Sequence, residues 1–142
     1  MDFRFEAITL RVADVDRAKA FYEQAGFGLD VDASHGDAFR VVQFTPPGSP
    51  ASVMFGIGLG TAPAGPVSGL YLVVTDVEAA FAELAGRGID LDPLRHMTPT
   101  GFQDGVDPAH ADYNSFSGFT DPDGNGWLLQ ERGHPERQPR EV

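Results

Sequence analysis

The sequence predicts an α+β fold: two βαβββ modules that form a curved mixed sheet with a concave cleft and carry their helices on the convex side. The main observation is an internal repeat, since a shift of 62 residues places Leu10 on Leu72, Asp14 on Asp76 and Gly26 on Gly88. Each copy reads as a strand, a capped amphipathic helix, a glycine stop and a second strand. The 17 glycines and 11 prolines indicate the many turns of an antiparallel sheet.

We expect residues 1–60 to form the first module, 61–68 a Pro/Gly linker, 69–132 the second module and 133–142 a flexible tail. In the first module, residues 5–12 alternate between polar and apolar side chains, as a half-buried strand does. Asp14 is a good N-cap for a helix that begins at Val15 and ends at Gly26. Three further strands are predicted at residues 27–31, 38–44 and 52–57.

The second module repeats this order. A strand is predicted at residues 69–74 and a helix at 77–87, capped by Asp76 and ended by Gly88. A strand at 89–94 and a long irregular stretch at 95–114 follow. Strands at 115–120 and 126–132 then form a hairpin across an Asp-Pro-Asp-Gly-Asn turn. Long irregular stretches often carry binding residues.

The composition excludes several classes of partner and of chemistry. The net charge is −11, and only 10 residues are basic, so we expect no nucleic-acid partner, because phosphate contact needs clustered cations. The absence of cysteine excludes thiol catalysis and disulfides. No apolar run approaches the ~20 residues of a membrane span, and the N-terminus lacks the pattern of a signal peptide. We therefore expect a cytoplasmic protein with no membrane partner.

Two motifs carry a family resemblance. DVDRAKAFY begins at Asp14, and FTDPDGNGWLLQE runs from Phe119 to Glu131. Together they resemble the vicinal oxygen chelate superfamily, which contains glyoxalase I, extradiol dioxygenases, fosfomycin-modifying enzymes and bleomycin-binding resistance proteins. The likeness covers nearly the whole chain and implies the fold, but one scaffold hosts many reactions.

The enzymes of this superfamily bind a divalent metal through one residue on the first strand and one on the last strand of each module. The resemblance places these positions at Ala7, Met54 (or Phe55 if the register shifts by one), Gly69 and Leu128. Divalent ions prefer imidazole nitrogen or carboxylate oxygen, which none of the four offers. We therefore expect no metal site, no cofactor and no catalytic residue.

The remaining residues suggest an apolar cleft with a few polar groups, which suits a flat organic ligand. Strand alternation places Trp127 in the core rather than in the cleft. His35, His96, His110 and His134 all fall in predicted loops or the tail, where solvated residues are the simplest interpretation, although His96 could reach over the cleft. The predicted ligand-binding residues are Thr9, Arg11, Phe39, Gln43, Met54, Tyr71, His96, Phe102, Tyr113, Phe116, Leu128 and Gln130.

We therefore predict a metal-free protein that sequesters a small, largely aromatic molecule, as the bleomycin- or enediyne-type resistance proteins of this superfamily do. The resemblance also implies a homodimer whose cleft is shared between chains. The alternative is an enzyme: a metal-dependent lyase or dioxygenase with other ligands, or a metal-free isomerase using Arg11, His96 or Tyr71 as acid or base. A third possibility is a pure interaction protein with an empty cleft.

Overall fold

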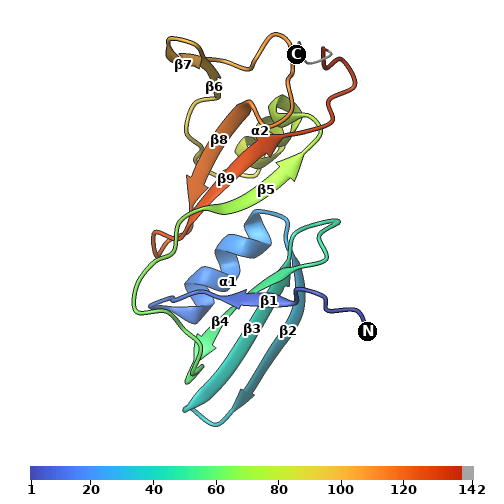
Figure 1. The fold of residues 1–142 in the computed structure, drawn as a ribbon. Helices are drawn as coiled ribbons and strands as arrows, with labels where there is room; N and C mark the ends of the chain where they lie inside the picture. Colours follow the sequence, from blue (N-terminus) through green and yellow to red (C-terminus); the bar gives the residue numbers. More distant parts are fainter. Residues whose placement is uncertain (139–142) are drawn as a thin grey trace. The chain divides into compact units, whose positions relative to one another are not determined.

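The computed structural model describes residues 1–138, in which nine strands and two helices form an α+β fold (Figure 1). Residues 139–142, the end of the predicted tail, lie outside the described residues. The chain divides into two compact units. The first comprises Met1–Val67 and the loop Asp121–Asn125, and the second comprises Ser68–Thr120 and the chain from Gly126 onward. The predicted fold class is confirmed, with one separate mixed sheet in each unit.

The first unit has the order β-α-β-β-β. Its elements are β1 (Ala7–Thr9), α1 (Val15–Gln24), β2 (Gly28–His35), β3 (Phe39–Thr45) and β4 (Ser52–Ile57). The sheet order is β1-β4-β3-β2, with β1 parallel to β4 and the other pairs antiparallel. The first strand is shorter than the alternating stretch at residues 5–12 predicts, and β2 extends past the predicted end at residue 31.

Helix α1 begins where the sequence predicts. The Asp14 carboxylate accepts a hydrogen bond from the backbone N–H of Arg17 at 3.0 Å, which satisfies one of the free amides of the first turn. The buried stripe of Val15, Ala18 and Tyr22 packs against β3 and β4. Aromatic rings form the core of this unit, in which Tyr22 contacts the buried rings of Phe27, Phe44 and Phe55 and also meets Phe21 edge to face.

The Asp-Pro-Asp-Gly-Asn turn closes this core. The buried Asp121 accepts hydrogen bonds from the Tyr22 hydroxyl at 2.8 Å and from the backbone N–H groups of Asp123 and Asn125. Asn125 in turn accepts from the backbone N–H of Val67 and donates to the backbone oxygen of Arg11. Buried polar groups with this many partners are strongly position-determining, so the motif has a structural role in the first unit.

The second unit contains one strand more. Its elements are β5 (Leu70–Val74), α2 (Val77–Gly86), β6 (Arg95–Thr98), β7 (Gly101–Asp104), β8 (Ser115–Thr120) and β9 (Gly126–Glu131), in the sheet order β5-β9-β8-β6-β7. Helix α2 packs against β8 and β9. Asp76 caps it as Asp14 caps α1, accepting from the backbone N–H of Ala79 at 3.0 Å.

Two predictions in this unit are wrong. Residues 89–94 form no strand, although Asp92 bonds to β8, where its amide donates to the Gly118 oxygen and its own backbone oxygen accepts from the Ser117 hydroxyl. The stretch 95–114 is not wholly irregular, because its first half is the β6–β7 hairpin. The hairpin turns at Pro99 and Thr100, and Gly101 at the start of β7 has a φ of +118°, which suits glycine alone. The sequence Ile-Asp-Leu-Asp alternates as a strand does, although it forms none. The Pro and Gly residues near the hairpin turn are typical of a loop, although β6 and β7 lie on either side of that turn.

The strand registers repeat the internal duplication. In the first unit Thr9 pairs with Met54, and in the second Tyr71 pairs with Leu128. Thr9 and Tyr71 are separated by the same 62 residues as the sequence repeat. No helix among the described residues combines the length and apolarity needed to cross a membrane.

Candidate functional site

The candidate site begins with the sheet face of the second unit that lies opposite α2, here named the open face. Along β9, Trp127, Leu129 and Glu131 are buried, whereas Leu128 and Gln130 are half-buried. This alternation confirms that Trp127 is a core residue, stacked on Phe119. Cross-strand partners share a face, so the registers define the open face as Tyr71, Val73, Arg95, Met97, Phe102, Asp104, Phe116, Gly118, Leu128 and Gln130.

The open face exposes large apolar side chains. Tyr71 is 63% exposed, Phe102 54% and Met97 45%. Phe102 meets Phe116 edge to face at 6.2 Å, and the Arg95 guanidinium lies 5.4 Å from the centre of the Phe102 ring. A face of aromatic and aliphatic side chains with a few polar groups matches the lining of organic-ligand sites.

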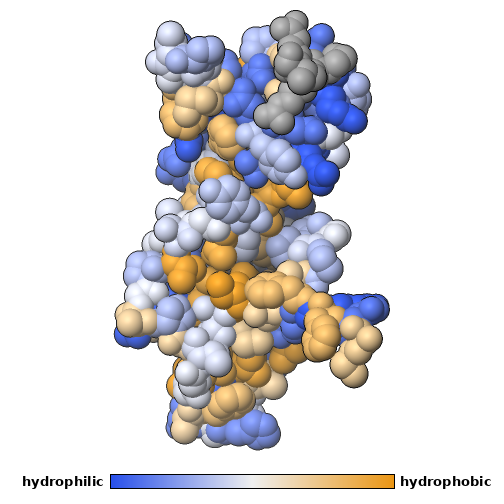
Figure 2. Space-filling view, viewed as in Figure 1, coloured by the Kyte–Doolittle hydropathy of each residue, from blue (hydrophilic) through white to orange (hydrophobic). Residues whose placement is uncertain are grey.

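The equivalent face of the first unit is better covered. The buried Thr9 shares a hydrogen bond of 2.7 Å with the Thr61 hydroxyl, and Gln43 donates to the Glu6 carboxylate at 3.1 Å. The register places Gln43 beside Met54, and Phe39 lies on the same face two pairs away. Figure 2 shows apolar surface over much of the visible side of this unit.

The structure thus groups most of the predicted ligand-binding residues on two faces, one in each unit. Thr9, Phe39, Gln43 and Met54 share the face of the first unit. Tyr71, Phe102, Phe116, Leu128 and Gln130 share the open face of the second.

Three predicted residues are placed differently. Arg11 lies beyond the end of β1 and is exposed. His96 is in β6 rather than in a loop, pairs with Ser115, and uses Nδ1 to bond the Gly105 oxygen. It therefore belongs to the face opposite Tyr71. Tyr113 lies in the loop before β8 with a φ of +63°.

The four family metal positions do not fit a divalent ion. Phe55 is fully buried, so Met54 is the residue of β4 that faces away from α1. A thioether is a soft ligand, and the side chains of Ala7, Gly69 and Leu128 contain no donor atom. The nearest carboxylate on β9, Glu131, is buried on the helix side of the sheet. No reaction step through a metal at these positions follows.

A second group of possible ligands lies on the helix side of the second unit. Donor atoms of His110, Glu131 and His134 fall within 4.8 Å of one another. The Glu131 carboxylate accepts from His110 Nδ1 at 3.0 Å and from the backbone N–H of Val77 at 2.9 Å. The prediction that both histidines are solvated is wrong, because both side chains are largely covered.

The orientation of the two rings argues against a shared ion. The His110 and His134 rings stack 3.7 Å apart with 9° between their planes. An imidazole nitrogen coordinates a metal in the plane of its ring, and two nearly parallel planes at this separation contain no common point nearby. Instead, the Glu131 carboxylate bonds both the His110 ring and the backbone N–H of Val77, and so connects His110 to the first turn of α2. The hydrogen bond to Glu131 raises the pKa of His110.

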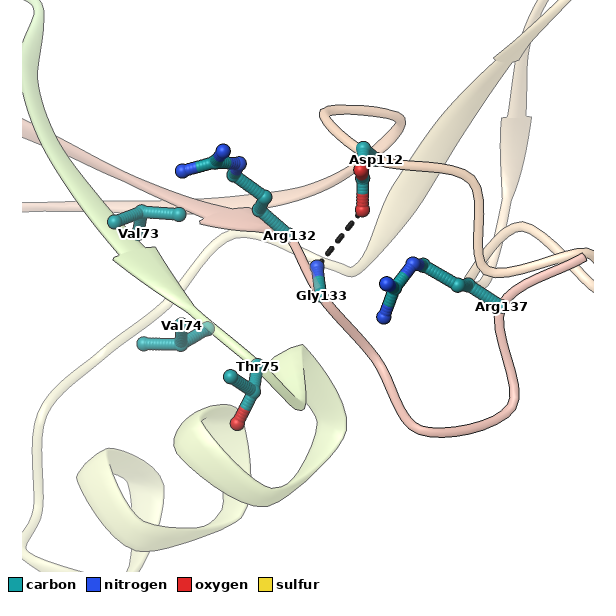
Figure 3. Close-up of a pocket in the computed structure, with 7 residues that line it drawn as sticks. All are labelled: Val73, Val74, Thr75, Asp112, Arg132, Gly133 and Arg137. Atoms are coloured by element: carbon teal, nitrogen blue, oxygen red, sulfur yellow. Dashed lines mark hydrogen bonds between the residues drawn. The ribbon is translucent and has the colours of Figure 1, made fainter. Parts of the chain in front are cut away.

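A pocket of about 350 Å³ lies at one end of the open face (Figure 3). Val73, Val74 and Thr75 form one wall, Asp112 another, and Arg132, Gly133 and Arg137 the rest. The sequence does not predict this pocket, because the pocket depends on the chain after Glu131, where the sequence predicts a flexible tail from residue 133.

Comparisons with known proteins agree with the fold. Residues 4–129 match the model of the Glyoxalase/Bleomycin resistance protein/Dioxygenase superfamily. Among solved structures, TnmS3, an antibiotic-binding protein from Streptomyces sp. CB03234, is 30% identical with a TM-score of 0.66. The alignment covers 92% of this chain and 96% of that one. A comparison with curated proteins found no match.

Two further structures show the same architecture. A glyoxalase/bleomycin resistance protein from Streptomyces sp. CB03234 is 30% identical, with a TM-score of 0.64 and coverage of 89% of this chain and 99% of that one. A bleomycin-binding protein complexed with bleomycin is 17% identical, with a TM-score of 0.57 and coverage of 93% and 99%. At that identity the second likeness concerns the fold alone.

Proposed function

Because the chain belongs to the Glyoxalase/Bleomycin resistance protein/Dioxygenase superfamily, we propose that it binds a small, largely aromatic molecule, an antibiotic of bleomycin or enediyne type, without changing it chemically. The observation that carries the proposal is the open face. Its aromatic side chains are exposed, while the four family metal positions offer no donor for a divalent ion. The antibiotic-binding character of TnmS3 supports the choice of ligand class.

Apolar burial and ring stacking supply the affinity in this proposal. Each stacked aromatic pair adds about 0.5–1.5 kcal/mol beyond its buried area. Tyr71, Phe102 and Phe116 together can therefore contribute a few kcal/mol, on a scale where a millimolar dissociation constant corresponds to about 4 kcal/mol. Sequestration needs no chemical step, since a bound drug is removed from solution by mass action.

Isothermal titration of the purified protein with a panel of bleomycin-type and enediyne antibiotics tests the proposal. We expect at least one ligand with an affinity better than about 1 mM. The variant Tyr71→Ala should weaken it, whereas Phe3→Ala, which removes an aromatic ring that is 90% exposed outside the open face, should not. If no member of the panel binds the wild-type protein, sequestration is the wrong function.

The enzymatic alternative has one observation in its favour, namely the proximity of the donor atoms of His110, Glu131 and His134. Metal analysis of the purified protein separates the two functions. Stoichiometric zinc, nickel, manganese or iron that is lost in His110→Ala would favour a metal-dependent enzyme. A metal-free acid–base pair of Tyr71 and His96 has less support, because the two residues lie on opposite faces of the sheet.

We also propose that the protein is a homodimer whose binding cleft is shared between the chains. Exposed apolar side chains on the two sheet faces support this, including Val31, which pairs with Gln43 and is 39% exposed, and Val73, which is 59% exposed. Large apolar patches commonly mark association surfaces. Sedimentation at micromolar concentration should give the mass of two chains, and the mass of one chain would refute the dimer.

A further inference from the structure

We propose that the ligand carries an anionic group, and that the pocket at the end of the open face takes it. This inference rests on the proposed function and adds the charge of the ligand to it. The expected ligand is an aromatic molecule with a carboxylate or an ionised phenol at one edge. Four features of the second unit support this assignment.

The first feature is that Arg132 extends the open face. It follows Gln130 by two residues, so strand alternation places it on the same side. Its backbone N–H donates to the Val74 oxygen at 2.9 Å, which fixes the start of the side chain. The guanidinium lies 5.6 Å from the centre of the Tyr113 ring and, in Figure 3, extends over Val73. Tyr113, predicted from the sequence to bind ligand, does not line the pocket, but its ring contacts Arg132, which does.

The second feature is the other cation. Arg137 comes from the turn after His134, where its backbone N–H and one guanidinium nitrogen both donate to the His134 oxygen, at 3.1 and 3.3 Å. Figure 3 shows its guanidinium directed toward Gly133 from the side opposite Arg132. The pocket therefore has the Arg137 guanidinium near Gly133 and the Arg132 guanidinium on the Val73 side, and glycine leaves room for a ligand to approach the backbone.

The third feature is the charge balance. Neither arginine forms an ion pair within 4.0 Å in the part of the chain that the structure describes. The one carboxylate in the lining, Asp112, accepts the backbone N–H of Gly133 at 2.8 Å. Two cations and one anion give the pocket a net positive charge in a chain of net charge −11. Guanidinium groups bind carboxylates through paired hydrogen bonds.

The fourth feature is the position of Val73, which lines the pocket and also belongs to the open face beside Tyr71. A ligand whose rings lie on the open face can therefore place a charged edge in the pocket. The volume of about 350 Å³ is at the lower end of the range for organic-ligand sites. The pocket thus suits one end of such a ligand better than the whole of it.

The test compares two probes that differ only in charge, anthraquinone-2-carboxylate and anthraquinone-2-carboxamide, by isothermal titration at low salt. The wild-type protein should bind the carboxylate more tightly by about fivefold, the size expected of partly exposed ion pairs. Arg132→Gln and Arg137→Gln should each reduce this preference, and added salt should reduce it in the wild type. The matched control Arg4→Gln removes the same charge from the first unit and should leave the preference unchanged.

Each outcome has a separate meaning. Equal binding of the two probes by the wild type refutes the anionic group but leaves sequestration of an aromatic ligand intact. Binding of neither probe, together with failure of the antibiotic panel, refutes sequestration itself. A preference that survives in both folded arginine variants places the anion elsewhere and refutes the site. Inorganic phosphate that binds as tightly as the aromatic carboxylate would indicate a site for free anions and would overturn the assignment to an aromatic ligand.

Discussion

Removal of one buried hydroxyl, in Tyr22→Phe, should measurably destabilise the first unit. The Tyr22 side chain is 0% exposed, and its hydroxyl donates to the Asp121 carboxylate at 2.8 Å. Because phenylalanine keeps the ring contacts, the loss is mainly one hydrogen bond to a charged group, which contributes about 1.5–3 kcal/mol. The same carboxylate oxygen also accepts from the Asn125 side chain at 2.8 Å, so it keeps one partner. We therefore expect a loss of about 2 kcal/mol.

Urea unfolding followed by circular dichroism measures this loss. With a slope of about 2 kcal/mol per molar urea, the midpoint should fall by about 1 M. The matched control is Tyr71→Phe, which removes a hydroxyl from a ring that is 63% exposed and should change stability by less than about 0.5 kcal/mol. If Tyr22→Phe is as stable as this control, the turn that contains Asp121 does not stabilise the first unit as argued.

Two other perturbations follow from the packing and the charges. The hydrogen bond to Glu131 raises the pKa of His110 above its ordinary value of 6.5, so its stabilisation is complete below that value and declines as pH rises through the raised one. The loss of stability between about pH 6 and pH 9 should therefore be smaller in His110→Gln than in the wild type, and an unchanged pH dependence would contradict this. Gly56→Ala would place a Cβ 1.8 Å from the Arg40 oxygen and should cost about 3 kcal/mol in urea unfolding. Gly60→Ala, which meets no atom within 4 Å, should not, and equal stability of the two variants would show that β4 shifts freely.

Much of the fold could be predicted, because the deciding signals are local and occur twice. Asp14 and Asp76 cap the two helices at the predicted residues, since a carboxylate before an apolar stripe satisfies the first free amides of a helix. The glycine-rich stretch after Phe55 has a packing explanation at Gly56, where a Cβ would collide with the Arg40 backbone. Strand alternation then placed Tyr71 and Leu128 correctly on one face.

The remainder depended on contacts between distant segments. The side of the sheet on which His96 lies follows from its position in β6. The sequence shows no clear strand there, so alternation along a strand could not be used to predict it. The covered positions of His110 and His134 result from a buried carboxylate on β9, and nothing local in a polar loop or a polar tail signals it. The pocket around Arg137 forms only because the chain after Glu131 packs beside β5.

Successive side chains of β9 point alternately to the core and to the open face, so stability and binding can be tested separately on this strand. Leu129 is 2% exposed on the helix side, where its neighbour Glu131 bonds to α2, whereas Leu128 occupies the open face. Leu129→Ala leaves a core cavity and should lower the free energy of unfolding by about 2–5 kcal/mol. Leu128→Ala should cost clearly less, because part of its side chain already contacts water, but should weaken the binding of an aromatic ligand. The pair is thus its own control: equal losses of stability would mean that the two faces of β9 are not independent, and unchanged binding by Leu128→Ala would remove the open face from the ligand site.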